Sequence, residues 1–297
     1  MGPARGGRVP SKGGIMFLLL SILAFGDFFN PTPAQPLPQA IYQIPYKTVD
    51  NETLYLDVFE PRDVSEPTPA VVYVHGGGWF LRDRTDFYDF ALGLGVQKIA
   101  GVTIDFRGLP PNGFYDQIKD IKDAIRWVRL HAKEYNIDPK RIGIVGSSSG
   151  AHLAALVATA GNGEGFDNDP PGTDSSVQSA VLFEGIYDLL DKHKDLTKLL
   201  FWFFTGGPRL FQAPGAFYNF SPMYKIDGSE PPCMMVYGTQ DEVVPKGQAQ
   251  RFAKDLRIHG VPAIAIPYPG PHGFNQLFFW TRPFQMAMTL KWFQGTL

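Results

Sequence analysis

Short apolar runs rich in β-branched residues alternate with stretches of helical periodicity from residue 70 onward, and this alternation constrains the fold more than any other feature. The helical spacing is clear at Ile118, Ile121 and Ile125. Strands that alternate with helices form a parallel sheet covered by helices on both faces. The sequence therefore predicts an α/β fold with a mostly parallel, twisted sheet. The predicted strands cover residues 70–74, 99–106, 141–145, 179–183, 233–237 and 263–268.

The two ends of this region carry weaker signals. Leu54, Leu56 and Val58 alternate with other residues, which predicts an antiparallel strand at the sheet edge, paired with residues 41–46. Pro283 is favourable in the first turn of a helix, so the last helix is expected to begin near it.

The N-terminal segment resembles a secretory signal. Residues 15–25 form an apolar run that follows Arg5, Arg8 and Lys12, and the run is too short to span a bilayer. We expect a signal peptide at 1–34, a mature domain at 35–297, a secreted or periplasmic location and no stable membrane insertion of the mature chain. An uncleaved anchor or a first core helix is the alternative.

Composition indicates one globular core and no nucleic-acid partner. Hydrophobic residues make up 44% of the 297 residues and charged residues 19%, which is sufficient for one well-packed core. The formal net charge of −2 gives no field that would attract nucleic acid, so no nucleic-acid partner is expected. The single cysteine, Cys233, lies in an apolar run and is expected in the core.

Residues 187–230 interrupt the alternation. This stretch has no strand pattern and is rich in aromatic residues, among them Phe201, Trp202 and Phe220. Insertions of this length in α/β domains are commonly lids or binding loops. An additional packing layer is the alternative.

A Gly-Ser-Ser-Ser-Gly sequence at 146–150 lies between a predicted strand and a helical run at 151–160. A serine in this strand-turn-helix setting is typical of a nucleophile elbow, in which a sharp turn projects the hydroxyl above the sheet. The glycines allow the strand and the helix to approach closely. Ser148 is therefore the predicted nucleophile, and the backbone N–H of Ser149 is predicted to stabilise an oxyanion at the helix N-terminus.

Three consecutive glycines follow the first parallel strand, in the sequence His-Gly-Gly-Gly-Trp at 75–79. Such a loop exposes backbone N–H groups that can bind an oxyanion, and Gly77 and Gly78 are the predicted donors. A phosphate-binding loop would require a following Lys-Ser/Thr pair, which is missing here. A plain turn remains the alternative.

A serine hydroxyl needs a base to accept its proton, and the chain has six histidines. In folds with this elbow the acid and then the histidine follow the serine, which leaves His259 and His272. His259 lies in the last turn of a predicted helix, where it complements the helix dipole. His272 follows the last predicted strand and is the predicted base. His152 lies one helical turn beyond the serine, where we expect a packing role.

The acid must orient the histidine and stabilise its charged form. Asp241 lies just beyond a predicted strand and is the predicted acid, with Glu242 and Asp188 as alternatives. Asp105 and Arg107 follow the second parallel strand, and we expect them to form a structural ion pair with each other near His75.

Together these motifs resemble the α/β-hydrolase superfamily over nearly the whole mature chain. The sequence at 75–79 resembles the oxyanion signature of hormone-sensitive-lipase-like esterases and of related secreted acetyl and feruloyl esterases that act on plant polysaccharide. The resemblance implies hydrolysis of carboxylic esters through an acyl-serine, without a metal ion or cofactor.

Two departures distinguish the chain from the hormone-sensitive-lipase group. That group typically has Gly-Asp-Ser-Ala-Gly where this chain has Gly-Ser-Ser-Ser-Gly, and its N-terminal cap helices are not evident here. These departures favour the smaller polysaccharide esterases with open sites.

The expected function is that of an exported esterase whose substrate is a small-molecule or polysaccharide ester with a short acyl, acetyl or feruloyl group. Trp79 and Phe274 are expected to stack against a sugar or an aromatic acyl group. A lipase, a peptidase or a thioesterase would use the same chemistry. A non-catalytic binding protein of the same fold is the alternative from another functional class.

Overall fold

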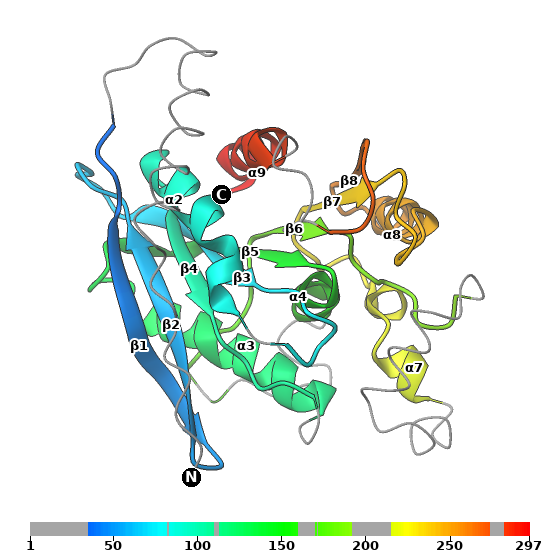
Figure 1. The fold of residues 1–297 in the computed structure, drawn as a ribbon, viewed down its shortest axis with the longest axis horizontal. Coiled ribbons are helices and arrows are strands. Elements are labelled where there is room, and N and C mark those ends of the chain that lie inside the picture. Colours follow the sequence, from blue (N-terminus) through cyan, green and yellow to red (C-terminus); the bar gives the residue numbers. More distant parts are fainter. Residues whose placement is uncertain are drawn as a thin grey trace. The chain divides into compact units, whose positions relative to one another are not determined.

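An eight-stranded sheet forms the centre of the computed structural model (Figure 1), with the strand order β1-β2-β4-β3-β5-β6-β7-β8. The structure describes residues 35–81, 83–109, 113–159, 170, 172–191, 215–273 and 282–297. Residues 37–297 form one compact unit. The predicted signal peptide at 1–34 lies outside the described residues.

The sheet is mixed but mostly parallel, as predicted. β2 pairs antiparallel with both β1 and β4, and every other neighbouring pair is parallel. The strands are β1 Gln39–Val49, β2 Glu52–Glu60, β3 Thr68–Val74, β4 Ala100–Ile104, β5 Ile137–Ser147, β6 Ser179–Phe183, β7 Cys233–Gly238 and β8 Ala263–Tyr268.

The antiparallel pair was predicted correctly, but the position of β2 at the sheet edge was wrong. β1 occupies the edge, and β2 lies between β1 and β4. Asp57 of β2 is completely buried there, and Arg84 pairs with its carboxylate at 2.7 Å.

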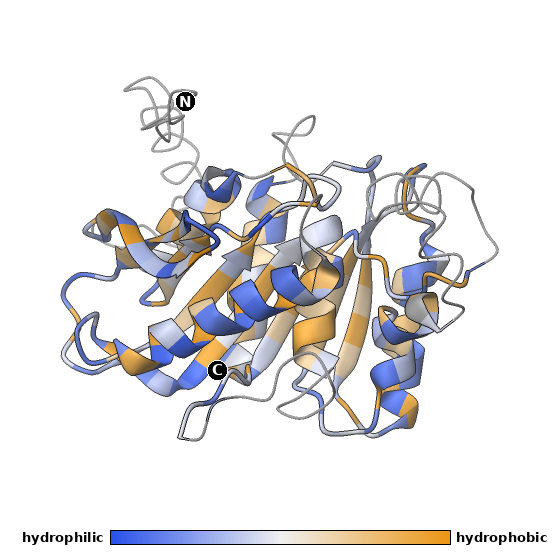
Figure 2. Ribbon diagram, turned by 90° about the horizontal axis from the view of Figure 1, so that it is seen from below, coloured by the Kyte–Doolittle hydropathy of each residue, from blue (hydrophilic) through white to orange (hydrophobic). Residues whose placement is uncertain are grey.

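Helices cover the sheet in two layers. Alternate strand residues enter opposite layers: Val72 packs in the layer that contains α3, α4 and α8, and Tyr73 packs in the layer that contains α2 and α9. Figure 2 shows mainly hydrophobic strands beneath helices that alternate between hydrophobic and hydrophilic residues. Within the described residues the helices are α2 Tyr88–Val96, α3 Phe114–Leu130, α4 Ser149–Thr159, α7 Ala216–Asn219, α8 Gly247–Ile258 and α9 Arg282–Thr296, with 3-10 turns η1 Arg84–Phe87 and η2 Pro222–Lys225.

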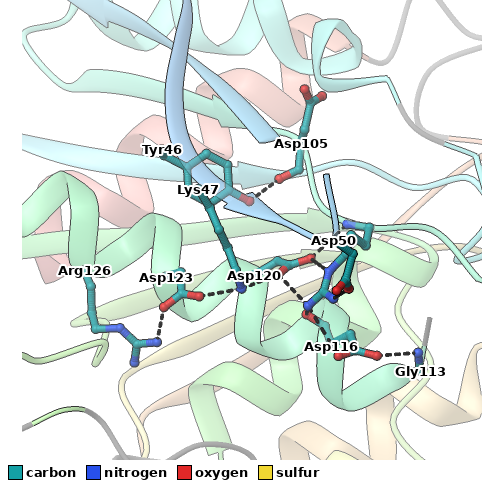
Figure 3. A network of polar contacts seen from close by, with 10 residues as sticks. Tyr46, Lys47, Asp50, Asp105, Gly113, Asp116, Asp120, Asp123 and Arg126 are labelled. Carbon is teal, nitrogen blue, oxygen red and sulfur yellow. Dashed lines mark hydrogen bonds and ion pairs between the residues drawn. The ribbon is translucent and has the colours of Figure 1, made fainter. Parts of the chain in front are cut away.

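A network of charged side chains joins the β1–β2 hairpin to α3 (Figure 3). Lys47 from β1 contacts the buried Asp120 at 2.5 Å and Asp123 at 2.6 Å. Arg107 also binds Asp120, at 2.8 Å. Asp105 instead pairs with Arg84 of η1 at 2.9 Å, so the predicted ion pair between Asp105 and Arg107 is wrong. Asp105 and Arg107 have separate partners because α3 presents the buried carboxylate of Asp120 to Arg107.

The predicted insertion at 187–230 is described only in part, because residues 192–214 lie outside the described residues. Its described portion contains α7 and η2 and no strand. Phe217 and Phe220 are buried in the layer that contains α4. The proposed roles of this segment, as a lid or as a packing layer, stay predictions. No helix in the described part of the chain has the length and apolar character needed to cross a membrane.

Candidate active site

The turn between β5 and α4 presents Ser148 at the carboxyl edge of the sheet. Its backbone has φ of 53°, in the left-handed region that non-glycine residues seldom adopt. The sharp turn of the elbow requires this conformation. Glycines flank it because there is no room for a Cβ. A Cβ on Gly146 would lie 2.4 Å from the carbonyl oxygen of Gly150, and one on Gly150 would lie 2.2 Å from that of His75.

Ser148, His272 and Asp241 form a continuous relay, so the structure brings together the three residues predicted from sequence. The hydroxyl oxygen of Ser148 lies 2.9 Å from Nε2 of His272, and Nδ1 of that ring lies 2.8 Å from Oδ2 of Asp241. The carboxylate can only accept, so we assign the ring proton to Nδ1. Nε2 is then free to accept the serine proton.

The loops that carry the acid and the base hold each other in place. Oδ1 of Asp241 accepts the backbone N–H groups of Val243 at 2.8 Å and Val244 at 2.7 Å, which leaves Oδ2 for the histidine. After β7, the N–H of Gln240 donates to the carbonyl oxygen of Gly270 after β8. The carboxylate is therefore oriented by its own turn before a substrate binds.

The glycine loop after β3 lies directly against the elbow. A Cβ on Gly76 would lie 3.0 Å from the carbonyl oxygen of Ser147 and 3.5 Å from Cβ of Ser148. Gly77 and Gly78 have φ of 112° and 63°, conformations that favour glycine. Within the described part of the chain, the N–H groups of Gly77, Gly78 and Ser149 donate no backbone hydrogen bond. These three N–H groups are the candidate oxyanion donors.

Both ends of that loop are anchored. At its start, Nδ1 of the buried His75 bonds the carbonyl oxygen of Gly76 at 2.8 Å, and burial lowers the pKa of His75. At its end, the side-chain amide of Gln117 and the N–H of Leu109 both donate to the carbonyl oxygen of Trp79. The loop is thus held from both sides before any charge develops on a substrate.

The surroundings of His272 favour its charged form. Burial opposes protonation and is the largest single influence on the ring. The hydrogen bond to Asp241 and the charges of Glu184 and Asp241 together outweigh it and raise the pKa of His272. Glu184 was not among the residues predicted from sequence. It follows β6 directly, and a charged residue at the carboxyl end of a strand beside β5 is the signal that could have identified it.

The relay does not include His152, His259 or either of the alternative acids, Asp188 and Glu242. His152 is completely buried, accepts a hydrogen bond from Nε1 of Trp79 at 3.1 Å and contacts the carbonyl oxygen of Phe220 at 2.7 Å. Exposed His259 caps the end of α8. Of the two alternative acids, Asp188 accepts hydrogen bonds from Leu190 and Tyr224, and Asp241 rather than Glu242 bonds His272.

The two predicted substrate contacts have different outcomes. Trp79 is only 2% exposed, and its ring packs at right angles to the rings of Phe114 and His152, so the predicted stacking against a substrate is wrong. Its φ of 69° turns the side chain into the core. Phe274 lies outside the described residues, and its predicted role stays a prediction.

Within the described residues, one group of side chains has the composition of a metal site, namely Glu184, Asp241 and His272, whose potential ligand atoms lie within 4.8 Å of one another. Nδ1 of the histidine already donates to Asp241, and Nε2 faces the serine. Both ring nitrogens of His272 are therefore already engaged in the relay.

Comparisons with known proteins place this geometry in context. The profile of the family described as BD-FAE matches residues 56–256. Esterase LipQ of Mycobacterium tuberculosis is 28% identical over 274 residues, which cover 90% of this chain and 65% of LipQ. LipC, an esterase of the same organism, is 29% identical over 237 residues, which cover 77% of this chain and 59% of LipC. The chain thus spans less than two thirds of the length of these curated relatives.

Solved structures of one esterase resemble the chain over nearly its whole length. Thermogutta terrifontis esterase 2 phosphoramylated by tabun superposes with a TM-score of 0.72 and 25% identity, covering 89% of this chain and 96% of that protein. The same esterase with butyrate bound gives a TM-score of 0.70 and 25% identity, covering 88% and 95%.

Proposed function

The chain belongs to the BD-FAE family and has the α/β-hydrolase fold, and from this premise we propose that it is a serine carboxylic-ester hydrolase. The observation that carries the proposal is the relay in which Ser148 lies 2.9 Å from His272 and His272 lies 2.8 Å from Asp241. The esterase relatives LipQ and esterase 2 support the same reaction class.

Acylation begins when Oγ of Ser148 attacks the ester carbonyl carbon while its proton moves to Nε2 of His272. The ring then carries a positive charge, which Asp241 stabilises through the Nδ1–H bond. The carbonyl oxygen becomes an oxyanion, for which the N–H groups of Gly77, Gly78 and Ser149 are the candidate donors. Collapse of this intermediate breaks the ester C–O bond, and the departing alcohol takes the proton from Nε2.

Deacylation repeats the same proton movements with water. His272 accepts a proton from the water molecule as its oxygen attacks the acyl carbon, and the proton then returns to Oγ of Ser148 as the carboxylic acid leaves. One base thus serves both half-reactions, and the reaction needs no proton acceptor outside the relay.

We further propose that the substrate carries a short acyl group, on a small alcohol or on carbohydrate, and that the protein is exported. The butyrate bound to esterase 2 supports a short acyl chain. The apolar run after Arg5, Arg8 and Lys12 supports export. Acetyl and feruloyl esters of saccharides are the substrates to test first, because the sequence resembles polysaccharide esterases.

The direct test is hydrolysis of p-nitrophenyl acetate by the purified protein and by its Ser148→Ala variant. We expect a loss of kcat on the order of 10⁶-fold, the scale seen when a catalytic serine is removed. Ser147→Ala is the matched control, because it removes the hydroxyl of the preceding residue, which lies outside the relay. An unchanged rate in Ser148→Ala would exclude the proposed nucleophile.

Covalent labelling separates an enzyme from a non-catalytic binding protein of the same fold. A fluorophosphonate probe should label the wild type and fail to label Ser148→Ala, since only an activated serine reacts. The phosphoramylated esterase 2 makes this chemistry suitable. A series of p-nitrophenyl esters of increasing chain length then distinguishes a short-chain esterase from a lipase, and a panel of acetylated and feruloylated saccharides tests the proposed carbohydrate substrates.

A further inference from the structure

A second carboxylate lies beside the catalytic histidine. Glu184 is 2% exposed and is the first residue after β6. Its backbone has φ of 54°, an unusual conformation for a glutamate and one that often occurs at functional sites. The preceding residue, Phe183, accepts the N–H of Ser148 at 2.8 Å, so this segment also supports the elbow.

The side chain of Glu184 contacts the loop of the base on two sides. Oε2 lies 3.7 Å from Nδ1 of His272 and accepts the N–H of Gly273 at 2.9 Å. Oε1 accepts the hydroxyl of Tyr268, at the end of β8, which also contacts the carbonyl oxygen of Pro271. The carboxylate thus binds the chain both before and after the histidine.

We propose that Glu184 is a positioning residue for His272, which fixes the histidine loop and whose negative charge stabilises the imidazolium together with Asp241. This inference rests on the proposed function of the relay. Glu184 accepts no proton in either half-reaction: Nδ1–H stays bonded to Asp241, and the mobile proton stays between Ser148, Nε2 and the substrate. The contribution of Glu184 is electrostatic and geometric.

Both side-chain oxygens of Glu184 accept hydrogen bonds, from Tyr268 and Gly273, which is the arrangement expected of a carboxylate. Burial, the largest influence, raises the pKa of Glu184, and the charge of Asp241 acts in the same direction. The proximity of His272 and the hydrogen bonds from Tyr268 and Gly273 oppose this rise. Among the described residues, Tyr187 also interacts with Glu184, and burial raises the pKa of that phenol well above its usual range.

The first test is the pH dependence of kcat/KM in Glu184→Gln. Glutamine retains an acceptor for Gly273 and a polar group for Tyr268 but removes the charge. That charge raises the pKa of His272, so its loss should move the acidic limb of kcat/KM to lower pH. We expect kcat on the plateau to fall on the order of tenfold, with little change in KM, because the imidazolium loses a stabilising charge.

Glu230→Gln is the matched control. Glu230 is also buried and accepts two backbone N–H groups, from Asp227 and Gly228, but it precedes β7 at the opposite edge of the parallel sheet. The acidic limb of kcat/KM in Glu230→Gln should coincide with that of the wild type. If the Glu184→Gln limb also coincides with the wild type, Glu184 has only a structural role and the proposal is overturned.

A double-mutant cycle with Asp241→Ala provides a second, independent test. When Asp241 is missing, Glu184 is the carboxylate left beside Nδ1, so Asp241→Ala should retain part of its activity. The fold-reduction of kcat in the double variant should therefore exceed the product of the two single fold-reductions by at least roughly tenfold. A strictly additive double variant would contradict the inference. Failure of the proposed function looks different, because the wild type itself would then hydrolyse no ester.

Discussion

The hydroxyl oxygen of Ser148 lies 2.9 Å from Nε2 of His272, although 124 residues separate them in the sequence. The serine follows β5 and the histidine follows β8, and β6 and β7 lie between these strands in the sheet. Because parallel strands end at the same edge, residues that follow different strands meet there. The geometry of the relay therefore depends on the order of the strands.

Replacing Asp241 by asparagine should reduce kcat for p-nitrophenyl acetate by up to about 10⁴-fold, because the amide favours the wrong histidine tautomer. Asp188→Asn is the control, since Asp188 follows the parallel strand β6, as Asp241 follows β7, but it bonds Leu190 and Tyr224. Steady-state kinetics of both variants decide between the two acids. A greater loss in Asp188→Asn would refute the assignment of Asp241.

Gly76→Ala should impair catalysis more than folding. The backbone of Gly76 is not left-handed, but the new Cβ would lie 3.0 Å from the carbonyl oxygen of Ser147 and displace the glycine loop that carries the candidate oxyanion donors. We expect kcat to fall about 10²-fold, the scale of one lost oxyanion donor, with a small change in melting temperature. Gly113→Ala, which meets only Asp116 at 3.7 Å, should leave kcat unchanged. Equal kcat in both variants would argue against this loop as the oxyanion site.

Gly150→Ala should destabilise the fold itself. Its Cβ would lie 2.2 and 2.3 Å from the backbone carbonyl oxygens of His75 and Val74, which cannot rotate away. Overpacking of this kind costs about 1–3 kcal/mol, measured as the free energy of unfolding in urea. Gly295→Ala in α9 meets no atom within 4 Å and should be neutral or stabilising by up to ~1 kcal/mol. A Gly150→Ala variant as stable as Gly295→Ala would show that the elbow is less crowded than described.

The stability of the protein should fall between pH 6.5 and pH 4 partly through His152. Burial lowers the pKa of His152 to about 4, although its contact with the carbonyl oxygen of Phe220 opposes the shift. In the unfolded chain His152 binds its proton near pH 6.5. Between pH 6.5 and pH 4 the unfolded state therefore binds more protons than the folded state, and the free energy of unfolding decreases as the pH is lowered. The expected contribution is about 3 kcal/mol over the interval.

Urea unfolding at neutral pH and at about pH 4.5 measures this effect. His152→Gln should be less stable than the wild type at neutral pH but should lose less stability on acidification. His259→Gln, which changes an exposed histidine, should keep the wild-type dependence on pH. If His152→Gln loses as much stability as the wild type, His152 is not the group that titrates.

Much of the sheet and all three relay residues could be predicted from sequence, for identifiable physical reasons. Parallel strands are buried on both faces and therefore appear as continuous apolar runs, as at β6 and β7. Ser148 has a local signature, the elbow glycines, and chain order then restricts the histidine to two candidates. The apolar runs and the elbow glycines are local sequence patterns, and the order of the relay residues can be read along the chain, so all of these signals are visible without a structure.

What could not be predicted depends on contacts between distant segments. Arg107 pairs with Asp120 because α3 folds back on the loop after β4, and nothing adjacent in sequence specifies that choice. Trp79 follows the candidate oxyanion glycines and resembles a site residue, but its ring is buried against Phe114 and His152. Glu184 lies beside His272 because β6 and β8 end at the same edge of one sheet, a contact that no local sequence pattern specifies.

Because the relay residues are far apart in the sequence, the reactivity of Ser148 should report a late stage of folding. Long-range parallel pairings form slowly because the loops between them must close first. Ser148 and His272 are in contact when β5, β6, β7 and β8 lie side by side in one sheet, so their contact requires these pairings. A refolding chain sampled with a fluorophosphonate should therefore recover its compact core before it recovers its label, and the delay between the two would measure the time needed to complete the sheet.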